Sequence, residues 1–170
     1  SLRTMAKCRQ KLAELGVTAS MRALYIERDD EAFGNLERYL DSATPDTVSA
    51  KCFHGDFVDL REQILTWSGR DAFTFFFIVP KVWKSIGIEK LRPLLQRPRS
   101  EFLINFIYDF INRTASMAEW QSDIAEFLGV SIGAVQELEH HSPQDREEKL
   151  LGHYRSSLKA ALPPQRSPFI

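Results

Sequence analysis

The feature that most constrains the fold is a run of apolar residues, FTFFFIVP, from Phe73 to Pro80. A short run of aromatic and β-branched side chains that ends at a proline is typical of a buried β-strand. Strands that are apolar throughout occur in parallel sheets, which helices cover on both faces. We therefore expect a parallel α/β sheet in which this run is the central buried strand.

Segments on either side of this run alternate between strand-like and helix-like patterns. Further strands are predicted at Ala23–Ile26, in a stretch ending at His54–Asp56, and from Glu101 onward. Alternation of this kind implies right-handed crossovers and parallel pairing. The predicted fold class is α/β, a Rossmann-like, doubly wound, mostly parallel sheet of about four strands with a helical C-terminal third. The predicted domains are a sheet domain over residues 1–116, a helical extension packed on it over 117–162, and a loose tail over 163–170.

Composition narrows the classes of function. The chain has 170 residues and a net charge of -1, so one domain is expected and no overall field attracts nucleic acid. Cys8 and Cys52 are far apart and no CxxC motif occurs, which argues against a metal site and favours the reducing cytoplasm. The longest apolar run falls short of the roughly 20 residues of a membrane helix. The basic stretch Leu91–Ser100 is either a solvated loop with helix C-terminal cations or, together with Trp83, a contact for a nucleic-acid backbone.

Acidic residues follow two of the predicted strands, where open α/β sheets bind their ligands. Glu27 ends the first strand, and its two carboxylate oxygens match the vicinal hydroxyls of a ribose. Asp56 ends the second strand after Gly55, which allows a flat ring to approach the backbone while the carboxylate accepts from an adenine amine. Helix capping is the alternative for both: either Asp29 or Asp30 can cap the next helix, with Glu27 in the same solvated cluster.

The sequence motifs of several other classes of enzyme are not found in this chain. His54 is interpreted as a partly buried strand-end histidine rather than a catalytic base. No phosphate-binding glycine loop and no nucleophile elbow is present. A NAD-dependent oxidoreductase shares the acid after the second strand, but its G-x-G-x-x-G motif is missing.

Four stretches carry a resemblance to a known family. They are ALYIERDDEAFGNLERYL, HGDF, FFFIVP followed two residues later by Trp83, and SEFLINFIYDFINR. Across residues 1–160 the chain resembles the three-Cys-motif partner proteins, which look like class I S-adenosylmethionine-dependent methyltransferases. The resemblance implies that Glu27 binds the ribose of S-adenosylmethionine and Asp56 its adenine. It also implies a partner, a three-Cys-motif protein that resembles radical enzymes.

The chain departs from this family at two places. The first strand with its glycine-rich loop, expected before Ser1, and the last two of the usual strands, expected after Arg155, are not found in the sequence. Without that loop, binding of S-adenosylmethionine is itself in question.

The second departure lies after the apolar run. Related aminomethyltransferases place an acid or amide before a proline there, so Val79-Pro80 is a degenerate form of that motif. The acceptor-side candidates are Asn105 and Tyr108, and Trp83 offers a stacking face. The resemblance thus predicts a methyltransferase-like domain with impaired or absent methyl transfer.

A second function stays open, that of a non-catalytic interaction module on a Rossmann-like scaffold. Missing edge strands would expose sheet edges and apolar surface that a partner must cover. A homodimer formed through an edge strand or the first helix would fit this alternative.

Overall fold

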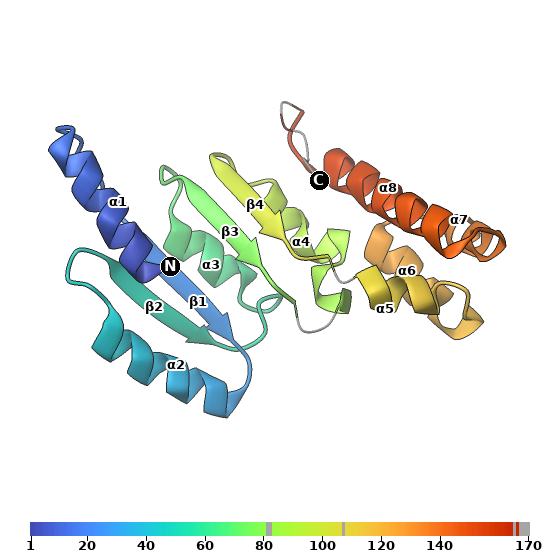
Figure 1. Cartoon of the computed structure of the whole chain (residues 1–170), viewed down its shortest axis with the longest axis horizontal. Helices are drawn as coiled ribbons and strands as arrows, with labels where there is room; N and C mark the ends of the chain where they lie inside the picture. The colour runs from blue at the N-terminus through green and yellow to red at the C-terminus, as the bar shows by residue number, and fades with distance from the viewer. Residues whose placement is uncertain (81–82, 107, 165, 167–170) are drawn as a thin grey trace. The chain divides into compact units, whose positions relative to one another are not determined.

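The computed structural model describes residues 1–80, 83–106, 108–164 and 166, without the side chains of Trp83 and Ser85. It is a mixed α/β protein in which every strand pair is parallel (Figure 1). The elements are α1 (Leu2–Glu14), β1 (Arg22–Glu27), α2 (Asp30–Ala43), β2 (Ser49–His54), α3 (Arg61–Ser68), β3 (Thr74–Ile78), η1 (Trp83–Ile86), α4 (Ile88–Leu95), β4 (Ser100–Ile104), α5 (Tyr108–Thr114), α6 (Ala118–Leu128), α7 (Ile132–Gln136), η2 (Glu137–His140) and α8 (Pro143–Ala161). No helix in the described ranges is long and apolar enough to cross a membrane.

The chain divides into two compact units, Ser1–Ile64 and Leu65–Ile170, called here the N-terminal and C-terminal units. In the N-terminal unit β1 pairs with β2, in register from Arg22 opposite Ser49 to Glu27 opposite His54. In the C-terminal unit β3 pairs with β4, from Thr74 opposite Ser100 to Ile78 opposite Ile104. Each strand is followed by a helix, as the alternating sequence pattern predicts.

A single four-stranded sheet is not confirmed. Among the described residues the strands form two separate pairs, β1–β2 and β3–β4, and no ladder joins them. Alternation of strands and helices predicts parallel pairing, which is confirmed. It does not determine which strands become neighbours, because any of several orders satisfies the same handedness rule.

The core of the N-terminal unit forms on one face of β1–β2. Leu2, Leu40 and Val48 are its buried members. Met5, Ala6, Ala23, Tyr25, Leu36, Ala50 and Cys52 pack against them. The strand members of this set alternate along β1 and β2, so they project to the same side of the sheet. Both α1 and α2 therefore pack on that side.

Helical spacing in the sequence predicts one apolar stripe per helix, and each is only partly buried. The stripe of the first helix is Met5, Cys8, Leu12 and Leu15, and that of the second is Phe33, Leu36, Tyr39 and Leu40. Leu15, expected on the buried stripe, is 77% exposed, and Cys8 is exposed too. Tyr39, predicted to lie on the apolar stripe of α2, is also exposed, whereas Leu40 beside it is buried. A stripe at helical spacing locates the apolar side of a helix but not which end of it the sheet covers.

The prediction that β3 is buried on both faces is wrong. Its side chains alternate: Phe75 and Phe77 are 57% and 66% exposed, while Phe76 between them is half-buried. On the half-buried face the rings of Phe76 and Phe102 stack, with centroids 4.8 Å apart. An apolar run without alternation cannot reveal which of its two faces the fold leaves uncovered.

The helical C-terminal third has a well-packed core. Tyr154 of α8 is buried, stacks on Phe127 of α6 at 5.2 Å between centroids, and donates to the Ile86 carbonyl at 3.1 Å. Burial raises the pKa of the Tyr154 hydroxyl. The sequence predicts that Gly129, Gly133 and Pro143 break this helical region. Breaks are confirmed at Gly129, a left-handed C-cap with φ 68°, and at Pro143, which opens α8. Gly133, also predicted to break the helix, lies inside α7.

The basic stretch is not a solvated loop throughout. Arg97 is only 6% exposed and donates to the carbonyls of Ala72 and Pro98, at 2.9 and 2.8 Å. These bonds tie the turn before β3 to the turn before β4. Since the guanidinium is occupied by backbone carbonyls, Arg97 is not presented to a nucleic-acid backbone.

Candidate functional site

The carboxyl ends of β1 and β2 bring the predicted nucleoside-binding residues together in the N-terminal unit. Glu27 lies opposite His54 in the parallel register, and the Gly55 N–H donates to the Glu27 carbonyl at 2.9 Å. This bond extends the ladder by one residue beyond the strands. Glu27, Gly55 and Asp56 therefore lie at one edge of the sheet, as the sequence predicts.

The turn between β1 and α2 fixes the Glu27 carboxylate. Its Oε1 accepts from the backbone N–H groups of Arg28 and Asp29, at 2.8 and 2.9 Å. Asp29 then caps α2, with its Oδ1 accepting from the Ala32 N–H at 2.9 Å. Helix capping, the alternative from the sequence, is thus present for Asp29. Glu27 combines a role in this turn with a position at the strand end.

Backbone geometry explains why a glycine and an aspartate occupy the turn after β2. Gly55 has φ 140°, a conformation that side-chain-bearing residues rarely adopt, and a Cβ there would lie 3.3 Å from Leu60 Cδ1. Asp56 Oδ1 accepts from the Val58 N–H at 2.8 Å and so closes the turn. Asp56 is half-buried, which leaves part of its carboxylate facing solvent.

His54 is more engaged than the sequence predicts. Its Nε2 lies 3.1 Å from Asp30 Oδ1 and 3.1 Å from the Arg28 carbonyl. Its ring packs on Phe33, with centroids 4.8 Å apart. The side chain is 42% exposed, so the histidine bridges the two loops at the surface.

Sequence reasoning missed two members of this cluster. Arg28 forms an ion pair with Asp56, at 3.8 Å between NH1 and Oδ2, and Phe33 flanks His54. Helical spacing could have found Phe33, which lies one turn after the cap Asp29. Nothing in the sequence pointed to Arg28, because its contact depends on how the two loops meet.

The charge of this cluster defines the ligands that it suits. Four carboxylates, one guanidinium and one imidazole gather there, from Glu27, Arg28, Asp29, Asp30, His54 and Asp56. A surplus of carboxylates accepts hydrogen bonds from hydroxyl and amine groups and repels phosphate. The edge is therefore better matched to a ribose or an amino group than to an anion.

The residues predicted on the acceptor side lie in the C-terminal unit. Val79 follows β3 and is 55% exposed, and Pro80 is half-buried. The Asn105 N–H donates to the Ile78 carbonyl at 2.9 Å, which places Asn105 at the adjacent strand end with an exposed side chain. Val79 and Asn105 are thus neighbours at this edge. The side chain of Trp83, the expected stacking face, lies outside the described residues.

Tyr108 belongs to a different environment. Its hydroxyl donates to the Pro143 carbonyl at 3.3 Å and accepts from the Asn112 amide. Burial, together with nearby carboxylates, raises the pKa of this hydroxyl. Tyr108 therefore links α5 to the start of α8, and its hydroxyl is used in helix packing.

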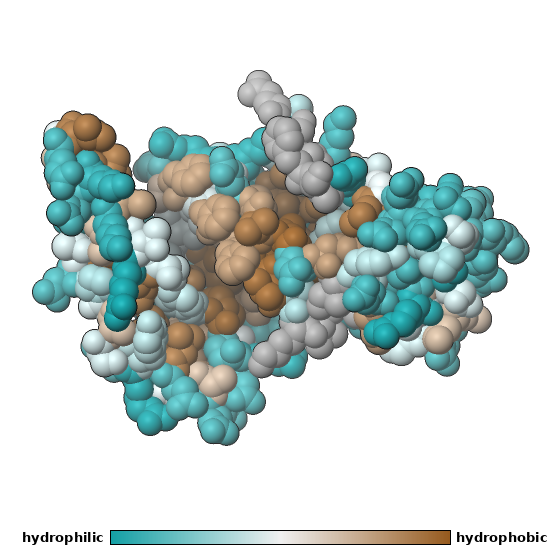
Figure 2. Space-filling model, viewed as in Figure 1, coloured by the Kyte–Doolittle hydropathy of each residue, from teal (hydrophilic) through white to brown (hydrophobic). Residues whose placement is uncertain are grey.

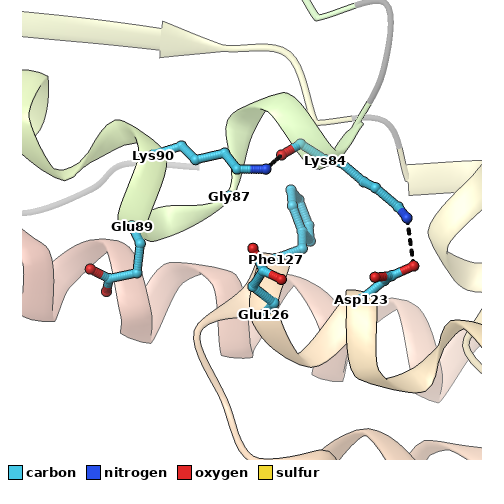
Figure 3. Close-up of a pocket in the computed structure, with 7 residues that line it drawn as sticks. All are labelled: Lys84, Gly87, Glu89, Lys90, Asp123, Glu126 and Phe127. Carbon is cyan, nitrogen blue, oxygen red and sulfur yellow. Dashed lines mark hydrogen bonds and ion pairs between the residues drawn. The ribbon is translucent and has the colours of Figure 1, made fainter. Parts of the chain in front are cut away.

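A small pocket lies elsewhere in the C-terminal unit (Figure 3). It is lined by Lys84, Gly87, Glu89, Lys90, Asp123, Glu126 and Phe127. Lys84 Nζ pairs with Asp123 Oδ2 at 2.5 Å, and Lys90 Nζ donates to the Lys84 carbonyl at 2.9 Å (Figure 3). Since these lysines bind groups of the pocket wall itself, the pocket is a packing seam and contains no predicted site residue.

Within the described ranges, no three His, Cys, Asp or Glu side chains are grouped so that they could hold a metal ion. No protein-family model matches the chain, and no curated protein or solved structure matches it either.

Proposed function

We propose that the chain is a nucleoside-binding domain of the S-adenosylmethionine-dependent methyltransferase type, similar to the three-Cys-motif partner proteins, with impaired or absent methyl transfer. One observation carries the proposal. The parallel register of β1 and β2 puts Glu27 beside the Gly55-Asp56 pair at the carboxyl edge. In this proposal the two parallel pairs are parts of a Rossmann-like sheet.

The chemistry of binding follows from the carboxylates. The Glu27 carboxylate, whose Oε1 is oriented by two backbone N–H groups, would accept from the ribose hydroxyls. Asp56, half-buried and held by the Val58 N–H, would accept from the adenine amine. Gly55 presents no side chain to the ring. S-adenosylmethionine is the proposed cofactor, and the same contacts would hold S-adenosylhomocysteine or adenosine.

The strand end after β3 supports the impaired chemistry. Val79 has no side-chain atom that accepts a hydrogen bond, so it cannot orient a target amine toward the methyl group. Asn105 at the neighbouring strand end is exposed and carries an amide, and it would be the remaining polar group on the acceptor side. A three-Cys-motif protein remains the proposed partner, and the free thiols of Cys8 and Cys52 support a cytoplasmic location.

Calorimetric titration with S-adenosylhomocysteine tests the proposal. Glu27→Gln keeps a carbonyl oxygen for the turn N–H groups but loses the second charged acceptor. We expect it, and Asp56→Asn, to weaken binding by about 10-fold each. Asp46→Asn is the matched control, since Asp46 is exposed and precedes β2 at the opposite end of that strand. The proposal fails if millimolar ligand gives neither heat nor a thermal shift, or if all three variants bind like the wild type.

The interaction module is the second candidate, and a separate observation favours it. One face of β3–β4 exposes large apolar side chains, which a parallel sheet ordinarily covers. A chain that binds no nucleoside but associates through this face would be an interaction module.

A further inference from the structure

An apolar surface lies on one face of the β3–β4 pair. Phe75 and Phe77 of β3 and Leu103 of β4 are 57%, 66% and 54% exposed. The register pairs Phe77 with Leu103, so these side chains project to the same side. Phe73 and Val79, at 58% and 55% exposed, continue the row beyond both ends of β3. We call these five residues the outer face; tan and brown side chains gather over β3 and β4 in Figure 2.

The opposite face of the same strands shows that this exposure is specific. There Phe76 stacks on Phe102, and Ile78 and Ile104 are half-buried. A parallel pair is ordinarily covered on both faces. Phe75 and Phe77 alternate with these covered residues, so the outer face follows one side of β3 and is not a set of scattered surface residues.

The size of the outer face is that of a protein interface. A phenylalanine has roughly 200 Å² to bury, so three at about 60% exposure present roughly 350 Å². Val79 and Leu103 bring the apolar total to about 500 Å². A standard interface buries about 800 Å² on each partner, of which about 65% is apolar in homodimers. The exposed apolar area therefore equals the apolar share of one side of a stable dimer.

Charge is compatible with a second copy as the occupant. The five side chains of the outer face are uncharged, and one carboxylate, that of Glu101, lies on the same side, opposite Phe75 in the register. A two-fold interface brings the same surface of both copies together, so it must complement itself. Aromatic side chains meet this condition by offset stacking, whereas a surface of one charge would repel its copy. The net charge of -1 adds little repulsion between two chains.

We propose that two copies of this chain form a two-fold dimer through the outer face of β3–β4. The interface centres on Phe75 and Phe77 of each copy, with Leu103 beside them. Nucleoside binding involves the N-terminal unit and is tested separately; Val79, at the margin of the outer face, is a residue that the acceptor side of the proposed function shares with it.

Sedimentation equilibrium of the full chain, from low micromolar to several hundred micromolar, tests the dimer. We expect a mass that rises with concentration to twice 19.6 kDa and no further. Phe77→Lys should raise the dissociation constant about 30-fold or more, because a buried aromatic anchor is lost and a charge is placed against its own copy. Leu15→Lys is the matched control: Leu15 is 77% exposed at the end of α1, and this substitution should leave the constant unchanged.

Phe77→Thr provides a second variant in case lysine prevents folding, since threonine suits a strand. It should weaken association in the same direction while keeping the wild-type circular dichroism spectrum. A monomer at every concentration overturns the proposal. So does a dimer that Phe77→Thr leaves intact, or a mass that grows beyond the dimer, which would indicate open-ended association.

Discussion

Replacing Arg97 with methionine should destabilise the C-terminal unit by about 3 kcal/mol. The guanidinium is 6% exposed and donates to the carbonyls of Ala72 and Pro98 at 2.9 and 2.8 Å. It also donates to the carbonyls of Gly69 at 2.5 Å and of Ser68 at 3.4 Å. One side chain thus holds the turn that leads into β3.

The magnitude follows from what each partner loses. A buried carbonyl left without a donor costs about 1–3 kcal/mol, and three carbonyls of the 68–72 turn lose theirs. Water can reach part of this turn, which lowers the sum. Removing a buried cation also relieves a cost, since burial and then the charge of Arg166 lower the pKa of Arg97. About 3 kcal/mol remains as the net loss.

Urea unfolding monitored by tryptophan fluorescence measures this loss of stability in the C-terminal unit itself. All three tryptophans, Trp67, Trp83 and Trp120, belong to Leu65–Ile170. Arg70→Met is the matched control, because Arg70 is an exposed arginine of the same turn region and should change stability by less than about 0.5 kcal/mol. Equal unfolding midpoints for Arg97→Met and Arg70→Met would refute the reasoning.

Two further predictions concern the backbone and pH. Gly55→Ala should destabilise the N-terminal unit by about 1–3 kcal/mol in thermal unfolding, because Gly55 has φ 140° and a Cβ there would lie 3.3 Å from Leu60. Gly34→Ala is the control: Gly34 lies in the interior of α2 with open space around it, so alanine should stabilise the unit slightly, and equal effects of the two substitutions would contradict this prediction. Burial raises the pKa of Tyr154 above its unfolded value, so its contribution to stability is complete below about pH 10 and is lost as the pH rises further. Tyr154→Phe should remove this loss of stability at alkaline pH, and it should cost about 1 kcal/mol at pH 7 because the hydrogen bond to the Ile86 carbonyl is lost. The prediction is contradicted if, above about pH 10, the urea midpoint of the wild type depends on pH no more than that of the variant.

The local structure could be predicted from the sequence where short-range chemistry determines it. Asp29 caps α2, Gly129 ends α6 and Pro143 opens α8, each as the residue type predicts. The pattern also placed Glu27 and Asp56 at the same edge, because parallel strands have their carboxyl ends at one edge, whereas their adjacency depends on the pairing of β1 with β2.

Other features depend on contacts between distant segments. The sequence could not show that β3 leaves Phe75 and Phe77 uncovered, since an apolar strand has the same sequence pattern whether it is buried on both faces or on one. The basic stretch that contains Arg97 is predicted to be either a solvated loop or a nucleic-acid contact. The burial of Arg97 could not be predicted, because it binds backbone carbonyls such as that of Ala72, 25 residues away, and any residue type has a backbone carbonyl. Tyr108 was placed on the acceptor side, whereas its hydroxyl binds at the start of α8.

Nucleoside binding at the β1–β2 edge is tested most directly by amide NMR during titration with S-adenosylhomocysteine. The N–H groups of Arg28 and Gly55 are direct reporters, since they donate to the Glu27 carboxylate and the Glu27 carbonyl. We predict saturable shift changes at Arg28, Gly55 and Asp56 that disappear in Glu27→Gln. Unchanged spectra at millimolar ligand, or changes confined to Leu65–Ile170, would contradict the proposed site.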